Sequence, residues 1–255
     1  MQRGRTGSLA VQVLVGTSGY SYKEWKGTFY PEDLKEADML RFYAERLKTV
    51  EINNTFYRMP ARELLERWMG EVPDDFTFVL KASRRITHEK RLAPDAADSV
   101  AYFFKTAEVL GPRQGPVLFQ LPPFVKKDVP RLRAFLALLP EGRPAAFEFR
   151  HETWFDDEVY EALRAGKAAL CSADTDESGE EGAPLVPTAG FGYLRLRRAG
   201  YTDQDLARWA ERIRAQPWER AFVFFKHEEA GKGPAMAARL VTRLGAPMHS
   251  GGPGA

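Results

Sequence analysis

Acidic, basic and imidazole side chains lie near the ends of several short apolar segments of this sequence. Glu51 and Glu148 are the best candidates for a general acid and base, since two carboxylates in different electrostatic settings can hold different protonation states. Lys81 and Arg150 would set that difference. His88, whose ordinary pKa lies near neutrality, is our preferred proton carrier. These residues predict acid–base catalysis, with hydrolysis and isomerisation fitting equally well.

A second set of polar and aromatic residues is suited to holding a substrate. Amides orient a ligand through hydrogen bonds, cations neutralise an anion or a developing negative charge, and aromatic rings stack on a sugar or base. The density of cations favours a small anionic or polar ligand. The candidate binding residues are Tyr20, Asn53, Asn54, Tyr57, Gln120, Arg150, Asp174, Arg195 and Lys226, and the aromatic residues Trp25 and Tyr30 are expected in neighbouring rim loops.

Two alternatives for the carboxylates stay open. Glu51, Glu148 and Asp174 with a histidine resemble the ligands of divalent-metal barrels, but Lys81 and several arginines argue against this, and we expect no metal or other cofactor. The pairing of Glu148 with Arg150 could also be purely structural. If the two glutamates serve function rather than packing, Gln in place of either should leave the melting temperature nearly unchanged or raised.

A third alternative is a non-catalytic barrel that binds a nucleotide or the end of a nucleic acid. Its hallmark would be a basic stripe leaving the pocket, which Arg195, Arg197, Arg198 and Lys226 could start. The formal net charge of +2, from 37 Lys and Arg against 35 Asp and Glu, weakens this alternative. Nucleic acid is therefore not the favoured partner.

Length and composition indicate one large globular domain. The chain has 255 residues, of which 44% are hydrophobic and 28% charged, which is enough apolar mass for a single core. The single Cys171 cannot form an internal disulfide, and we see neither a membrane-spanning nor a signal-peptide segment, so a cytoplasmic location is expected. We expect disordered or flexible tails at 1–10 and 246–255 and a folded domain over 11–245.

The elements that position these residues alternate between short apolar segments and amphipathic ones, a pattern typical of βα units. The strands are expected at 11–16, 49–53, 76–82, 115–121, 145–149, 168–174, 191–196 and 220–227. The helices are expected at 34–47, 61–69, 95–110, 128–139, 156–165, 203–215 and 232–244. Eight similar strands predict a closed (β/α)₈ TIM-type barrel of parallel strands. The Gly-, Pro- and acid-rich segment 175–190 predicts a loop or one short turn as the sixth crossover.

The polar candidates fall mainly at the carboxyl ends of the predicted strands, which form the active-site rim of such a barrel. Burying a charge costs several kcal/mol unless it is paired, so a set of charged strand ends around one mouth suggests function. Side chains alternate along a strand, which places Glu51 with Asn53, Glu148 with Arg150, and Tyr193 with Arg195 and Arg197 on common faces.

Five ordered motifs resemble those of a known family, DUF72 or YecE-like, over nearly the whole chain. They are GTSGYSYKEWKGTFYP (16–31), VEINNTFYRMP (50–60), FVLKASRRITH (78–88), GPVLFQLPP (115–123) and FEFRHETW (147–154). The resemblance implies a TIM barrel and supplies no reaction. It places near the pocket Glu51, Asn53, Lys81, His88, Gln120, Glu148 and Arg150. Many members have His-Gly after strand seven and paired Asn after strand eight, whereas this chain has Arg197-Arg198 and Lys226-His227.

Overall fold

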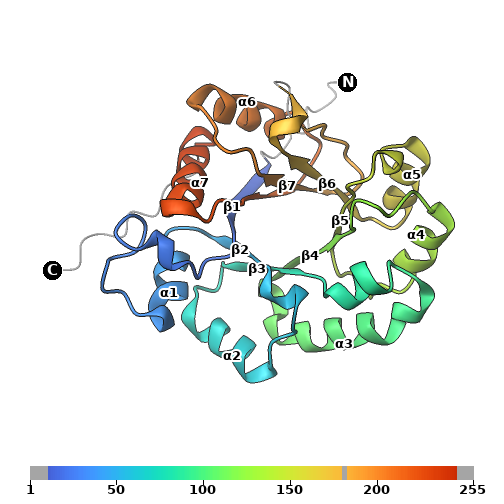
Figure 1. Ribbon diagram of the computed structural model, residues 1–255, viewed down its shortest axis with the longest axis horizontal. Coiled ribbons are helices and arrows are strands. Elements are labelled where there is room, and N and C mark those ends of the chain that lie inside the picture. Colours follow the sequence, from blue (N-terminus) through green and yellow to red (C-terminus); the bar gives the residue numbers. More distant parts are fainter. Residues whose placement is uncertain (1–10, 180–182, 246–255) are drawn as a thin grey trace, which may run out of the picture.

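Eight parallel strands close into a barrel in chain order, which confirms the predicted fold class (Figure 1). The computed structural model describes residues 11–179 and 183–245, so the expectations for 1–10 and 246–255 concern residues outside that range. Pairing of the first strand with the last closes the sheet. The strands are β1 (Gln12–Ser18), β2 (Thr49–Ile52), β3 (Thr77–Lys81), β4 (Gln114–Gln120), β5 (Ala145–Glu148), β6 (Ala169–Asp174), β7 (Phe191–Leu196) and β8 (Arg220–Phe225).

Helices surround the barrel, and the sixth crossover is irregular, as predicted (Figure 1). Among the described residues, that crossover contains only a short 3-10 turn at Asp176–Ser178. The helices are α1 (Met39–Ala44), α2 (Arg62–Glu71), α3 (Ala97–Ala107), α4 (Val129–Leu136), α5 (Asp157–Ala165), α6 (Asp203–Arg214) and α7 (Lys232–Arg243). No helix among the residues that the structure describes is long and apolar enough to span a bilayer.

Three of these helices begin at polar capping residues. The side chains of Asp128, Asp156 and Thr202 accept hydrogen bonds from backbone N–H groups in the first turns of α4, α5 and α6. Such caps satisfy donors that have no partner within the helix. These caps therefore fix the residue at which α4, α5 and α6 each begin.

Two apolar layers hold the barrel together. The inner layer is a cluster of buried side chains that includes Leu14, Val79, Cys171 and Phe222, and a larger cluster fills the space between strands and helices. Cys171 thus lies inside the barrel, and burial raises the pKa of its thiol, which fits an inert core residue. Gly16 is required where β1 meets β2, because a Cβ there would lie 2.0 Å from the carbonyl oxygen of Thr49.

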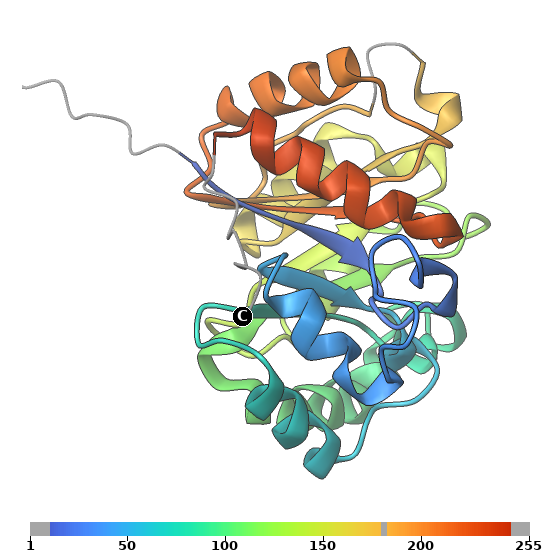
Figure 2. The same ribbon diagram turned by 90° about the vertical axis from the view of Figure 1, so that its left-hand side faces the viewer.

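The strands all run towards one face, where the connecting loops form a rim. The arrowheads of β1 and β2 point to the right in Figure 2, which is the face turned to the viewer in Figure 1. Trp25 and Tyr30 lie in the loop after β1 but are only 0% and 1% exposed, so their rings anchor this loop rather than stack on a ligand. Trp25 Nε1 donates to the carbonyl oxygen of Glu228, 3.0 Å away. Because all eight strands are parallel, their carboxyl ends meet at this one face, which we call the mouth of the barrel.

Candidate functional site at the carboxyl end of the barrel

A buried network joins Glu51 on β2, Arg195 on β7 and Glu148 on β5 across the barrel. Arg195 Nη2 donates to Glu51 Oε1 at 2.9 Å, and Arg195 Nη1 donates to Glu148 Oε2 at 2.5 Å. The exposed fractions of the three residues are 0%, 1% and 0%, respectively. One guanidinium therefore binds two carboxylates from well-separated strands, which fixes all three side chains at the floor of the mouth.

Two hydroxyl groups complete the surroundings of Glu51. Ser18 Oγ donates to Glu51 Oε1 and Tyr193 OH donates to Glu51 Oε2, both at 2.6 Å. Ser18 and Tyr193 belong to this network, although our sequence analysis did not select them as site residues. Tyr193 could have been selected, because it shares a strand face with Arg195, whereas Ser18 gave no signal beyond its place in a Gly-rich turn.

Glu148 is surrounded by three arginines. Besides Arg195, Arg150 Nε donates to its Oε1 at 3.0 Å, and Arg197 Nη1 lies 3.6 Å from the same oxygen. Burial alone would raise the pKa of Glu148, but the charges of the arginines outweigh this effect and lower the pKa to about 2. Glu148 is therefore ionised near neutral pH and is poorly suited to donate a proton. The sequence analysis named Glu148 as a candidate general acid or base, and these contacts make it unsuitable as the acid.

Lys81, at the end of β3, lies beside the same mouth. Its Nζ donates to Gln120 Oε1 at 2.7 Å and sits 4.3 Å from the centre of the Phe56 ring. Burial and the charge of Arg195 lower the pKa of Lys81 to about 8, although Glu51 and Glu148 act in the opposite direction. Lys81 can thus exchange a proton with a ligand near neutral pH, unlike an ordinary lysine.

His88 lies in a single π-helical turn, Arg85–Glu89, in the loop that follows β3. Its ring packs edge-on against Phe56, with centroids 4.8 Å apart, so Phe56 contacts both His88 and Lys81. Partial burial, followed by the charges of Lys81 and Arg150, lowers the pKa of His88. These effects favour the neutral imidazole over the imidazolium ion.

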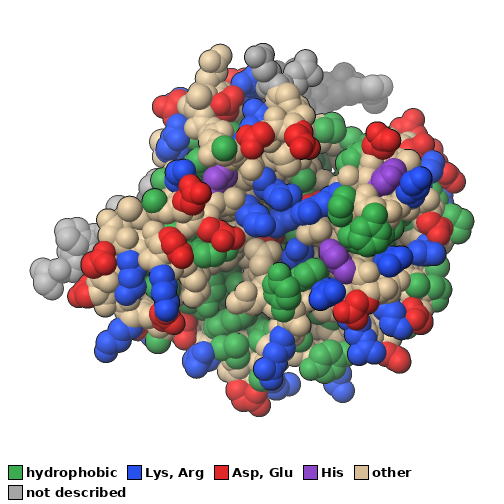
Figure 3. All heavy atoms as spheres, in the orientation of Figure 1, with side chains coloured by type: hydrophobic (Ala, Val, Ile, Leu, Met, Phe, Trp, Pro, Cys, Tyr) green, Lys and Arg blue, Asp and Glu red, His purple; other side chains and the backbone are tan. Residues whose placement is uncertain are grey.

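Further cations ring the mouth above the network. Arg150, Arg197 and Lys226 follow β5, β7 and β8. Burial and neighbouring positive charge, above all that of Arg195, lower the pKa of Arg197 and of Lys226. Figure 3 shows Lys and Arg side chains gathered at the centre of this face. The mouth is thus strongly cationic although the chain as a whole is almost neutral.

Several predicted binding residues lie apart from this network. Asn53 is half-buried and Asn54 is exposed at a 3-10 turn after β2, and Tyr57 in the same loop is 80% exposed. Tyr20 packs against Tyr43 of α1, with ring centroids 6.2 Å apart. Among the residues the structure describes, none of these four has a side-chain hydrogen bond to Glu51, Arg195 or Glu148.

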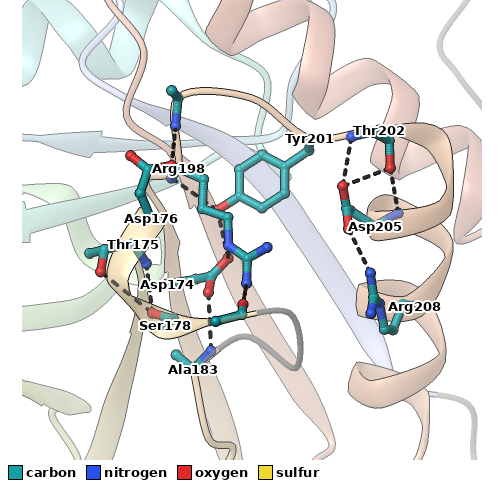
Figure 4. A network of polar contacts seen from close by, with 12 residues as sticks. Asp174, Thr175, Asp176, Ser178, Ala183, Arg198, Tyr201, Thr202, Asp205 and Arg208 are labelled. Carbon is teal, nitrogen blue, oxygen red and sulfur yellow. Dashed lines mark hydrogen bonds and ion pairs between the residues drawn. The ribbon is translucent and has the colours of Figure 1, made fainter.

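Asp174 belongs to a separate network on the outer side of β6 (Figure 4). Its Oδ1 accepts from the backbone N–H of Ala183 at 3.1 Å, and its Oδ2 accepts from Tyr201 OH at 2.8 Å. Arg198 Nε lies 2.9 Å from the same Oδ2. Asp174 is fully buried, so it joins the loops after β6 and β7 and does not line the mouth.

The carboxylates do not fit a divalent metal. Glu51 and Glu148 both bind Arg195, and Asp174 faces away from them. Within residues 11–179 and 183–245, no three acidic, His or Cys side chains converge as metal ligands would. The metal-site alternative from the sequence therefore loses its proposed ligand set.

A hollow lies at the other end of the barrel. It has a volume of about 580 Å³ and is lined by the starts of β1, β4, β7 and β8, including Gln12, Gln114 and Arg220. Enzymes with this fold place their chemistry at the carboxyl strand ends, because the loops there are free to vary. We therefore take the cationic mouth, and not this hollow, as the candidate site.

Comparisons with known proteins agree with this architecture. UPF0759 protein YunF of Bacillus subtilis is 24% identical over 257 residues, covering 86% of this chain and 90% of that protein. UPF0759 protein YecE of Escherichia coli is 35% identical over 117 residues, which is 46% of this chain and 43% of that protein. The crystal structure of a DUF72 family protein from Thermotoga maritima superposes with a TM-score of 0.78 at 25% identity, covering 92% of this chain and 99% of that one.

A second structural relative and a family model complete the comparison. A DUF72 family protein from Enterococcus faecalis superposes with a TM-score of 0.76 at 18% identity, over 92% of this chain and 96% of that one. The model of the family described as "Protein of unknown function DUF72" matches residues 14–253. Since that match spans almost all of the sequence, this chain belongs to the DUF72 family.

Proposed function

We propose that this barrel is an enzyme that binds a small anionic substrate in its carboxyl-end mouth and acts on it by proton transfer, as in hydrolysis or isomerisation. Arg195 is held between Glu51 and Glu148 and forms the rigid floor of the site. Lys81 and His88 are the proton carriers.

One observation carries this proposal, namely the excess of positive charge at the mouth. Glu51 and Glu148 form ion pairs with three arginines, Arg150, Arg195 and Arg197. Two lysines, Lys81 and Lys226, add positive charge at the same mouth and form no ion pair among the described residues. The pKa of Lys81, of His88, of Arg197 and of Lys226 is lowered, in each case partly by neighbouring cations. Like charges held together in this way destabilise the site, and a bound anion would relieve the repulsion.

The geometry divides the work among these residues. Arg150 and Arg197, whose side chains are 32% and 24% exposed beside Glu148, present guanidinium groups that suit a carboxylate or phosphate, and Lys226 adds a third cation. Gln120 orients Lys81 through its hydrogen bond. Because Glu148 stays ionised, it positions cations, and the proton must pass through Lys81 or His88 instead.

Anion binding can be tested by thermal unfolding. Phosphate and pyrophosphate should raise the melting temperature saturably, compared with chloride at equal ionic strength. Arg150→Ser and Lys226→Ser should each weaken this effect at least tenfold in apparent affinity. Lys105→Ser, which removes an exposed cation from α3, is the matched control and should leave it unchanged. Equal stabilisation of all four proteins would contradict the proposal.

Turnover is tested separately by incubating the protein with a mixture of cell metabolites and following depletion by mass spectrometry. We expect loss of an anionic metabolite with wild type and none with Lys81→Met.

A second candidate function is the binding of a single nucleic-acid strand. It is favoured by three exposed aromatic residues on rim loops, Tyr57, Phe124 and Phe155. Salt-sensitive retention of single-stranded DNA, without depletion of any metabolite, would favour that candidate instead.

A further inference from the structure

Lys81 differs from the three arginines of the mouth in its partners. Arg195, Arg150 and Arg197 each lie within 4 Å of a carboxylate oxygen. Within the described part of the chain, Lys81 forms no ion pair, and its Nζ contacts a neutral amide oxygen and an aromatic ring. A lysine that is largely withdrawn from water and lacks a carboxylate partner is costly to keep as an ammonium ion.

The surroundings of Lys81 therefore give it a larger neutral amine fraction near pH 7 than an exposed lysine has. Burial and the positive charges of Arg195 and Arg150 all act in this direction. Enzymes activate lysine as a nucleophile in this way, by withdrawing it from water and placing another cation beside it. Gln120 and Phe56 also hold Nζ in one place beside the mouth.

We propose that Lys81 is a nucleophilic amine, which attacks the aldehyde or ketone carbon of a small anionic substrate and forms an imine with it. This inference rests on the proposed function, because Arg150, Arg197 and Lys226 hold the anionic group. The amine lone pair forms the new C–N bond, and the carbonyl π electrons move to oxygen. The oxygen of this adduct takes up two protons and leaves as water, while the nitrogen gives up its two protons, so the exchange with solvent leaves no net change in protons. One carbonyl and one amine thus give one imine and one water, without an oxidant or reductant.

Reductive trapping tests this step on the wild-type protein. Glyoxylate, a two-carbon aldehyde with a carboxylate, is added with cyanoborohydride, which reduces the imine to a stable secondary amine. Peptide mapping by mass spectrometry then gives the labelling rate of each lysine. We expect Lys81 to be labelled at least about tenfold faster than the exposed Lys23 and Lys105, since far more of it is neutral near pH 7. Labelling of Lys81 no faster than of Lys105 would overturn the inference.

Matched probes and a matched variant separate the two proposals. Glycolaldehyde, which has the same size but no charge, should label Lys81 more slowly than glyoxylate does, and sulfate should compete only against glyoxylate. Lys81→Arg keeps the positive charge, so it should retain stabilisation by phosphate while losing the fast label. If phosphate stabilises wild type but Lys81 is not labelled preferentially, the imine inference fails and the anion site stands. If phosphate does not stabilise wild type, the proposed function itself fails.

Discussion

Arg195 Nη1 lies 2.5 Å from Glu148 Oε2 at the floor of the barrel mouth, and both side chains are almost completely buried. The same guanidinium also binds Glu51, so the strands β2, β5 and β7 are joined by charge as well as by packing. Removing one partner of such a group leaves a buried charge without compensation, which is more costly than never having buried it.

The first prediction concerns Arg195 itself. Arg195→Met should lower the free energy of unfolding by about 3–5 kcal/mol, because two buried carboxylates lose their common cation. Tyr193→Phe, which removes one hydrogen bond to Glu51, should cost only about 1–3 kcal/mol. Urea unfolding followed by circular dichroism measures both. A loss below 1 kcal/mol for Arg195→Met would show that the network adds little to folding.

The second prediction concerns the pH dependence that Glu148 confers. Its pKa is about 2 in the folded protein and 4.5 ordinarily, so its stabilising effect is present above about pH 5 and is lost as the pH falls towards 2. Wild type should therefore be more stable than Glu148→Gln at pH 7, and the difference should shrink between pH 5 and pH 2. These contacts reverse the expectation that Gln at position 148 would leave stability unchanged or raised. Urea unfolding at a series of pH values tests this, and a constant difference would contradict it.

The third prediction separates the Asp174 network from the mouth. Asp174→Asn should destabilise the protein by about 1–3 kcal/mol, because Arg198 and Tyr201 lose a buried charged acceptor. It should not change the apparent affinity for phosphate, since Asp174 lies on the outer side of β6 (Figure 4). Thermal unfolding with and without phosphate gives both values. A weaker phosphate effect in this variant would place Asp174 at the site after all.

The fourth prediction concerns the closure of the barrel. Gly16→Ala puts a methyl group 2.0 Å from the Thr49 carbonyl oxygen, so β1 and β2 must separate. We expect a loss of at least about 1–3 kcal/mol, or failure to fold. Gly190→Ala is the matched control, because a Cβ there meets nothing within 4 Å. Expression, followed by urea unfolding of both variants, tests this. Equal stability of the two proteins would contradict the close approach of the strands.

The strands could be predicted because each is a short apolar segment between turns, and eight such segments of similar length favour closure. The site was harder to predict. Alternation shows which residues share a strand face, but both faces of a parallel barrel strand are buried, so it does not show which face is inside. Asp174 was therefore selected although it faces outward, opposite to Cys171. Nor can sequence alone show which cation binds both glutamates, since Arg150, Arg195 and Arg197 are equivalent until the strands are in register.

The anion site at the mouth can be tested most directly by soaking crystals with tungstate, a tetrahedral oxyanion that scatters X-rays anomalously. We predict an anomalous peak within hydrogen-bonding distance of Arg150 and Lys226, and its absence from crystals of the Arg150→Ser, Lys226→Ser double variant. Tungstate found only on the outer surface of the helices, with none at the mouth, would contradict the account.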